Sequence, residues 1–217
     1  MKKITIDTIL TIAVILFLSM NYYSVSAQTN TSTIIDEWAT IKAPPPPKLQ
    51  PVTVDLKNTA LLILDIQKGN CNAERRPRCI DSIEKIKKLL DKARTHGISV
   101  IYSLTSSANK SDIKDEVAPR KEEPIVQSGA NKFYGTRLEA ILRDRGIKTV
   151  IIVGTSAHGA VINTATGAAL RGFQVIIPVD GMSSSDPYAE QYTAWHLVNG
   201  PGSRRRTTLT RVDLIEF

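Results

Sequence analysis

The chain has 217 residues, of which 42% are hydrophobic and 23% are charged, and its formal net charge is +7. This composition is typical of one globular domain with some additional processing sequence. A basic surface favours acidic partners or membranes. However, no stripe of interleaved aromatic and basic residues is present, which argues against a protein that binds nucleic acid.

The N-terminal segment has the layout of a secretory signal peptide. Residues 1–3 form a short basic head, residues 9–18 form an apolar run, and residues 25–27 are small. This layout predicts a signal peptide over residues 1–27, cleaved after Ala27, and an exported, periplasmic or secreted mature protein. The alternative is an uncleaved membrane anchor, for which the apolar run is short. After cleavage we expect no stable membrane insertion.

Residues 28–56 are predicted to form a proline-rich N-terminal extension. They contain four consecutive prolines, residues 44–47, which favour an extended polyproline conformation. The folded domain is then predicted over residues 57–217. No internal repeat is apparent in it.

Apolar runs and segments with helical spacing alternate through this domain. Strands are predicted at residues 59–65, 98–104, 147–154, 173–181 and 207–215, with an ambiguous short segment at 123–127. Helices are predicted at residues 80–97, 134–146, 160–171 and 186–199. This alternation indicates an α/β protein with a mainly parallel sheet covered on both faces. Such proteins bind ligands at the carboxyl ends of their strands.

Helix ends are marked by their usual residues. Asp81 and Glu84 resemble a capping box at the start of the first helix, and Gly97 is a natural stop for it. Thr136 and Glu139 resemble a second capping box.

The two cysteines, Cys71 and Cys79, lie close together in the sequence. In a cytosolic protein such a pair would suggest metal or redox chemistry, whereas in an exported one it indicates first a disulfide that closes a small loop. Two cysteines without a nearby cluster of histidines make a poor zinc site. We therefore predict a Cys71–Cys79 disulfide, no metal and no cofactor.

Asp65 and Lys132 are the candidates for acid–base chemistry. Asp65 ends a buried strand, where partial loss of solvent raises the pKa of a carboxyl and suits it to give or take a proton. The alternative is an aspartate that only caps the following turn. Lys132 lies between a strand and a helix. It either holds Asp65 ionised or orients a substrate oxygen, or it is an ordinary solvent-exposed lysine.

The turn at residues 154–160 is the candidate for binding a substrate oxygen or carboxylate. It opens a helix, so its unpaired backbone N–H groups suit a developing oxyanion. Thr155, Ser156 and His158 are its side chains with chemical reach. His158 is either a hydrogen-bond donor to the substrate or a structural histidine.

Three segments together resemble the isochorismatase-like cysteine hydrolase superfamily: "LLILDIQ", "KFYGTRLEAILRDRGIKTVIIVG" and "GTSAHGAVINTATGAALRGFQVIIPVDGMSSSDPYAEQ". The resemblance implies a Rossmann-like three-layer α/β/α sandwich. It also implies a site built from an aspartate, a lysine and a nucleophilic cysteine, with a cis peptide bond that maps to Thr155–Ser156. Members often oligomerise, which leaves a homo-oligomer open here. Some relatives bind zinc through aspartate and histidine, but the three histidines here are scattered in the sequence.

The residues of the superfamily site map unevenly onto this chain. The aspartate maps onto Asp65. The usual lysine position, six residues before Phe133, is occupied by Gln127, and Lys132 is displaced along the chain. The usual cysteine position, six residues after the turn glycine, is Ala160. Because alanine cannot attack a carbonyl, thioester chemistry at that position is absent.

Three functions are therefore compatible with the residues. "SAHGA" is similar to the turn of true isochorismatases, which hydrolyse vinyl ethers by acid catalysis and need no covalent intermediate. The first function is thus an exported hydrolase acting on a small molecule, through a vinyl-ether or C–N type bond, with Asp65 as acid or base. The second is a non-catalytic small-molecule-binding protein. The third is an amidase that uses Cys71 or Cys79 as a relocated nucleophile.

Overall fold

The computed structural model describes residues 32–217, and the predicted signal peptide lies outside them. The chain divides into two compact units, and the second begins at Pro45. The described part of the first unit contains one short helix, α2 (Ile34–Glu37). Within residues 32–217, no helix has both the length and the apolar character needed to cross a membrane.

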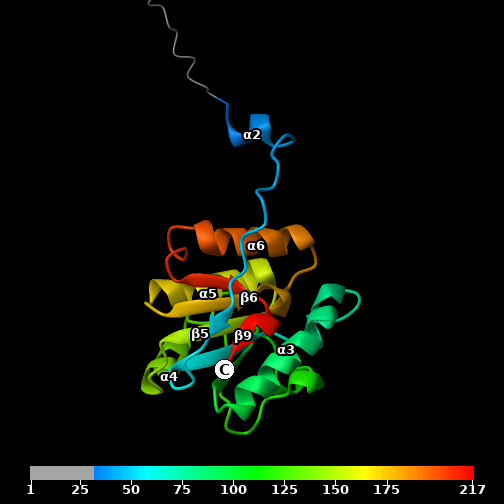
Figure 1. The fold of residues 1–217 in the computed structure, drawn as a ribbon. Helices are drawn as coiled ribbons and strands as arrows, with labels where there is room; N and C mark the ends of the chain where they lie inside the picture. The colour runs from blue at the N-terminus through cyan, green and yellow to red at the C-terminus, as the bar shows by residue number, and fades with distance from the viewer. Residues whose placement is uncertain (1–31) are drawn as a thin grey trace, which may run out of the picture. The chain divides into compact units, whose positions relative to one another are not determined.

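The second unit is built on a seven-stranded sheet in which every strand pair is parallel (Figure 1). The strand order is β4-β3-β2-β5-β6-β8, and β7 pairs with β5 outside this path. The strands are β2 (Thr59–Leu64), β3 (Ser99–Leu104), β4 (Ile125–Gln127), β5 (Thr149–Thr155), β6 (Gln174–Pro178), β7 (Met182–Ser183) and β8 (Thr207–Thr210). A separate two-stranded sheet pairs β1 (Val52–Thr53) with β9 (Ile215–Glu216).

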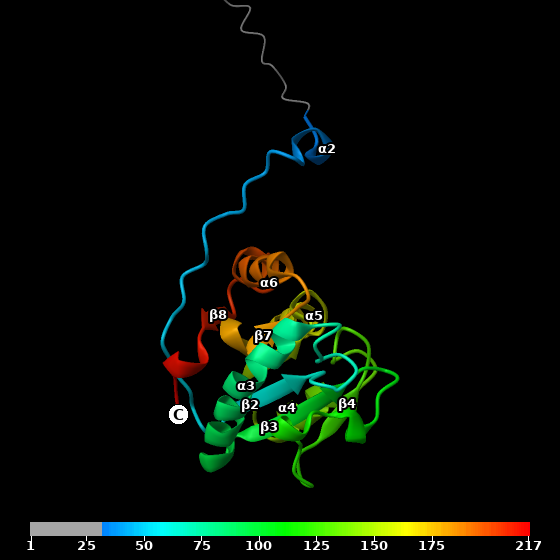
Figure 2. The same ribbon diagram turned by 90° about the vertical axis from the view of Figure 1, so that its right-hand side faces the viewer.

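Helices cover both faces of the large sheet, which gives the predicted three layers. The main helices are α3 (Pro77–Thr95), α4 (Leu138–Asp144), α5 (Ile162–Leu170) and α6 (Pro187–Asn199). Side chains alternate along each strand, so Leu62 belongs to the hydrophobic cluster of α4, α5 and α6, whereas Leu61 and Ile63 belong to that of α3. Figure 2 shows α6 beside the outer strand β8. The α/β sandwich predicted from the sequence is confirmed.

The strand order reverses direction between β2 and β5, at the centre of the sheet. From β2 the chain continues outward through β3 and β4, then returns to β5 on the other side of β2 and continues to β6. Leu64, the last residue of β2, pairs with Ser103 of β3 and with Gly154 of β5. The segments that follow β2 and β5 therefore meet at the switch point, where open α/β sheets bind ligands.

Several element boundaries differ from the sequence expectation. The first large helix begins at Pro77 rather than near Asp81, because proline is well suited to the first helical turn. The final predicted strand, 207–215, is interrupted by a short 3-10 helix. The compact domain starts at Pro45 rather than at residue 57, because β1 pairs with β9 and adds part of the extension to the domain.

Gly154 makes the close approach between β2 and β5 possible. Its φ is +131°, and a Cβ built there would lie 2.1 Å from the carbonyl oxygen of Leu64. We expect Gly154→Ala to lower the free energy of unfolding by about 2–5 kcal/mol, from backbone strain and overpacking together. Urea denaturation measures this. Gly129→Ala is the control, because a Cβ at Gly129 meets no atom within 4 Å. Equal stability of the two variants would contradict the prediction.

Candidate active site

Asp65 and Lys132 form a buried ion pair at the switch point. Lys132 Nζ lies 2.8 Å from Asp65 Oδ2, and the two side chains are 0% and 5% exposed. Asp65 directly follows β2 with a φ of +54°, and Lys132 lies in the loop between β4 and α4. Lys132 is therefore not the solvent-exposed lysine that the sequence left open.

The ammonium group of Lys132 uses all three of its hydrogens on protein atoms. Besides Asp65 it contacts the carbonyl oxygens of Ser128 at 3.0 Å and Leu104 at 3.3 Å. Its own backbone is held on both sides, because its N–H donates to the Thr164 hydroxyl and its carbonyl accepts from the Thr136 hydroxyl. An ammonium has three donors, so none remains for a substrate.

The second carboxylate oxygen of Asp65 is held by Ser103. Ser103 Oγ donates to Asp65 Oδ1 at 2.7 Å, and Ser103 is buried. Burial raises the pKa of Asp65 above its ordinary value, although Lys132 and the Ser103 hydrogen bond oppose this rise. Ser103 was missed by the sequence analysis. The available signal was a serine next to the last residue of a mainly apolar strand.

The turn after β5 has the cis peptide bond that the resemblance implies, between Thr155 and Ser156. A π-helical turn, Ala157–Val161, follows and leads into α5. Thr155 is buried and donates its hydroxyl to the carbonyl of Ser183, so it supports the turn from behind. Ser156 is half-buried.

His158 is exposed and is held by a chain of polar contacts. Its Nδ1 lies 2.8 Å from the hydroxyl of Ser184, whose backbone N–H donates to Glu190 at 2.8 Å. Glu190 in turn accepts two hydrogen bonds from Arg78 at the start of α3. Ser184, Glu190 and Arg78 were not predicted as partners of His158. The segment after β7 and the first turns of α3 and α6 lie together only in the folded protein.

Gln127 is not hydrogen-bonded to Asp65 or to the turn. Its side-chain nitrogen contacts the carbonyl oxygens of Thr105 at 3.0 Å, Ser106 at 3.2 Å and Ala108 at 2.7 Å. Gln127 thus fastens the loop that follows β3. Lys132, five residues later in the sequence, supplies the cation beside Asp65 instead.

No free thiol accompanies this pair. Ala160 is 5% exposed and belongs to the hydrophobic cluster on the α5 side of the sheet. The two cysteines of the chain form the predicted Cys71–Cys79 disulfide, and both are fully buried. The sulfur atoms therefore offer no nucleophile in this state.

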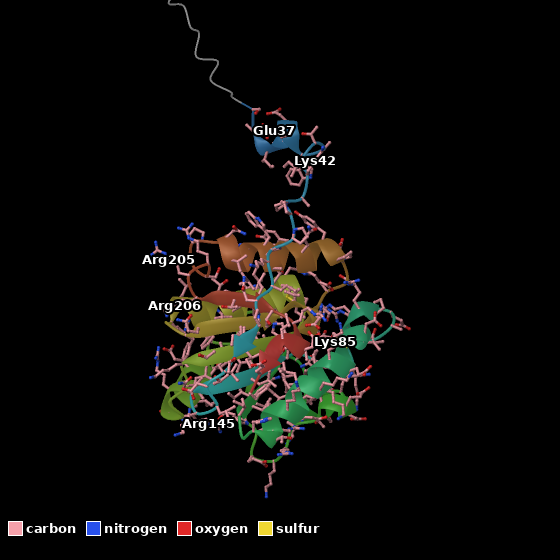
Figure 3. All side chains as sticks on the ribbon, viewed as in Figure 1. Glu37, Lys42, Lys85, Arg145, Arg205 and Arg206 are labelled. Atoms are coloured by element: carbon pink, nitrogen blue, oxygen red, sulfur yellow. A yellow bond between two sulfur atoms is a disulfide. The ribbon has the colours of Figure 1, made fainter. Side chains whose placement is uncertain are left out.

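The remaining polar groups of residues 32–217 include exposed arginines and no cluster of candidate metal ligands. Figure 3 shows Arg205 and Arg206 extending from the surface of the domain, and both are exposed. In the part of the chain from residue 32 to 217, no group of three or more histidine, cysteine, aspartate or glutamate side chains is arranged to hold a metal ion.

The fold and the pair define a class of protein. A parallel three-layer α/β sandwich holds a buried aspartate–lysine pair at its switch point, beside a turn with a cis peptide bond. The Isochorismatase domain family matches residues 59–208. The chain belongs to the isochorismatase family of hydrolases, whose members act on small molecules, amides among them.

Individual relatives match different shares of their own length. The secreted isochorismatase effector Isc1 of Verticillium dahliae is 28% identical over 148 residues, which is 63% of this chain and 78% of that protein. The N-carbamoylsarcosine amidase of an Arthrobacter species is 30% identical over 106 residues, 48% of this chain and 40% of that protein.

Solved structures share the fold. N-carbamoylsarcosine amidase from Thermoplasma acidophilum superposes with a TM-score of 0.63 at 23% identity, over 72% of this chain and 97% of that one. An isochorismatase-like hydrolase from Alkaliphilus metalliredigens superposes with a TM-score of 0.65 at 24% identity, over 72% of this chain and 95% of that one. The family predicted from the sequence is confirmed.

Proposed function

We propose that this chain is an exported hydrolase of small molecules in which Asp65 acts as the acid–base group and water is the nucleophile. The observation that carries the proposal is the buried Asp65–Lys132 pair beside the 154–160 turn. The position of the usual nucleophile is Ala160, and the two cysteines are joined to each other. Acid–base chemistry is compatible with all of these facts, whereas thioester chemistry is not.

Vinyl-ether hydrolysis illustrates the reaction. Protonated Asp65 donates its proton to the vinyl carbon, and the substrate becomes an oxocarbenium ion. Water adds to the cationic carbon and returns a proton to Asp65, after which the hemiketal separates into a carbonyl compound and an alcohol. The raised pKa of Asp65 favours the protonated form that the first step needs. Lys132 and Ser103 hold the carboxyl in one orientation.

The turn after β5 supplies the binding groups in this proposal. Ser156, His158 and the backbone at Ala160 line the position of the substrate oxygen, and Thr155 supports them from below. In the tautomer in which His158 Nδ1 accepts from the Ser184 hydroxyl, Nε2 carries the hydrogen and is a donor. A hydrogen-bond donor there would stabilise negative charge on the bound substrate.

A second candidate function is a non-catalytic binding protein. It is favoured by the two departures from the superfamily site, at Gln127 and Ala160. A third, cysteine-dependent amide hydrolysis, requires the disulfide to be reduced and a buried sulfur to become accessible.

Export is supported by three observations. Residues 1–27 have the layout of a signal peptide, the domain contains a disulfide, and a relative in Verticillium dahliae is described as secreted. We expect mass spectrometry of the exported protein to find an N-terminus at Gln28. An intact N-terminus retained in the membrane would contradict this expectation.

A substrate screen tests the proposed reaction. The mature chain and its Asp65→Ala variant are assayed against amides, hydroxamates, vinyl ethers and enol ethers. We expect one class to be hydrolysed by the parent, lost in the variant, and unaffected by prior treatment of the protein with iodoacetamide. Loss of turnover after alkylation would favour the cysteine mechanism. Binding of a small anion without turnover of any class would favour the binding protein.

A further inference from the structure

Ser184 is a buried serine whose hydroxyl contacts the ring of His158. The Ser184 hydroxyl lies 2.8 Å from His158 Nδ1, and Ser184 is 0% exposed. Within residues 32–217 this hydroxyl has no other hydrogen-bond partner. The ring of His158 belongs to an exposed residue, and its second nitrogen, Nε2, makes no hydrogen bond in the described part of the chain. Nε2 is therefore the ring nitrogen that is left for a ligand.

The burial of Ser184 decides which ring nitrogen carries the hydrogen. A hydroxyl has one hydrogen to donate, and a neutral histidine has one N–H and one acceptor nitrogen. If Nδ1 carried the hydrogen and donated it to Ser184, the hydroxyl hydrogen would lie buried without an acceptor, which is unfavourable. If Ser184 donates to Nδ1, the hydroxyl and Nδ1 are both satisfied and the ring hydrogen is on Nε2. The second arrangement is the favoured one.

The backbone contacts of three elements hold Ser184 in this position. β7 pairs with β5 so that Ser183 lies opposite Thr155, and Ser184 follows directly. The N–H of Ser184 donates to Glu190 Oε1 at 2.8 Å, and Arg78 Nε at the start of α3 donates to the same oxygen at 2.8 Å. The negative charge of Glu190 is thus paired with Arg78 while its oxygen fixes the backbone at Ser184. The place of the hydroxyl follows from that of the backbone.

We propose that Ser184 is a positioning residue that holds His158 in the tautomer with the hydrogen on Nε2, and that Glu190 and Arg78 hold Ser184 in place. The inference rests on the proposed function in one respect, which is that Nε2–H donates to an oxygen of the substrate. It narrows the substrates to molecules that present an acceptor oxygen to the 154–160 turn, because an N–H donor does not match another N–H group.

The first test observes the ring directly, without turnover. Isotope-labelled histidine is incorporated into the mature protein, and the chemical shifts of the ring nitrogens are measured by NMR at about pH 8.5, where an ordinary histidine is neutral. His158→Gln assigns the signals of His158. His96 is an internal reference of the opposite form, because its Nδ1 lies 2.9 Å from the carbonyl oxygen of Lys92 and must donate to it. We expect the hydrogen of His158 on Nε2 and that of His96 on Nδ1.

Two variants then separate Ser184 from its surroundings. Ser184→Ala removes the hydroxyl and keeps the backbone contact with Glu190. We expect the ratio of the Nε2–H form to the Nδ1–H form of His158 to fall about 2- to 10-fold, as for loss of one hydrogen bond. Glu190→Ala, which frees the backbone at Ser184, should lower the ratio in the same direction.

Ser183→Ala is the matched control for the ratio. Ser183 is adjacent and 1% exposed, but its hydroxyl has no partner within residues 32–217 and does not contact His158. This variant should leave the ratio as in the parent. A hydrogen on Nδ1 of His158 in the parent, or the same ratio in the parent and Ser184→Ala, would overturn the inference and leave the Asp65 mechanism standing.

The second test is a double-mutant cycle with a substrate found in the screen. Because Ser184 acts through His158, Ser184→Ala should lower kcat/KM about 2- to 10-fold in the parent and have no further effect in His158→Gln. Equal losses in the two backgrounds would show a merely structural role for Ser184 and would overturn the inference. If the ring has the expected form but no substrate class is turned over, the proposed function fails, and the control of the His158 ring by Ser184 stands on the NMR result.

Discussion

Replacing Asp65 with asparagine is expected to lower kcat/KM by about 10²–10⁴-fold, the usual contribution of a positioned acid–base group. Asparagine has nearly the shape of aspartate and keeps an oxygen acceptor for Ser103 or Lys132. However, its amide is not an acid and cannot transfer a proton to the substrate. Because the Lys132 ammonium then lacks its counter-charge, rates must be compared per folded molecule, with circular dichroism as the check.

Asp180 offers a matched control for this variant. It also follows a strand of the sheet, but its carboxylate is held by Lys85 at 3.5 Å and by the backbone N–H of Val212 at 3.0 Å. Asp180→Asn should therefore change stability and leave kcat/KM within a few-fold of the parent. If Asp65→Asn were as active as Asp180→Asn, the acid–base mechanism would be wrong.

The second large effect is expected for Lys132→Met, which should lower the free energy of unfolding by about 3–5 kcal/mol at neutral pH. Methionine fills a similar volume but leaves the carboxylate of Asp65 buried without its cation. The pKa of Asp65 must then rise further, because Lys132 is the main group that lowers it against the effect of burial. Urea denaturation of the two proteins measures the difference.

The pH dependence of this loss has a defined sign. With the folded-state pKa of Asp65 above its unfolded value of about 3.9, the folded state binds the proton more tightly. The loss of stability caused by Lys132→Met should therefore be small below the unfolded pKa. It should grow as pH rises from the folded-state pKa of Asp65 in the parent to the higher one in the variant, and stay constant above that. If protonated Asp65 is the active form, the rate of the parent should fall as pH rises through the pKa of Asp65.

A double variant separates the contribution of the ion pair to stability from the contribution of side-chain packing. Asp65→Asn with Lys132→Met removes both charges, so it should recover part of the stability that Lys132→Met loses. A loss of less than about 1 kcal/mol in Lys132→Met would be typical of an exposed pair and would contradict the buried one.

Much of the fold follows from local sequence patterns. Strands buried on both faces have nearly continuous apolar sequences, as in residues 59–64. Helices have apolar residues at helical spacing and end near a glycine such as Gly97. These patterns depend on neighbours in the sequence, so they predict the α/β class without any knowledge of the tertiary contacts. The Cys71–Cys79 disulfide was predictable for the same reason, because its partners are close in the chain.

The site itself depended on contacts between distant segments. Asp65 was recognisable as a strand-end carboxylate, but Ser103 reaches it through the register of β3 against β2, and Lys132 reaches it from a loop beyond β4. A lysine has a long, flexible side chain, so its position in the sequence does not determine where its ammonium group lies. Gln127, at the usual lysine position, binds loop carbonyls instead. The sequence thus predicted the fold and singled out Asp65 as a strand-end carboxylate, whereas the tertiary structure decided which groups hold that carboxylate in place.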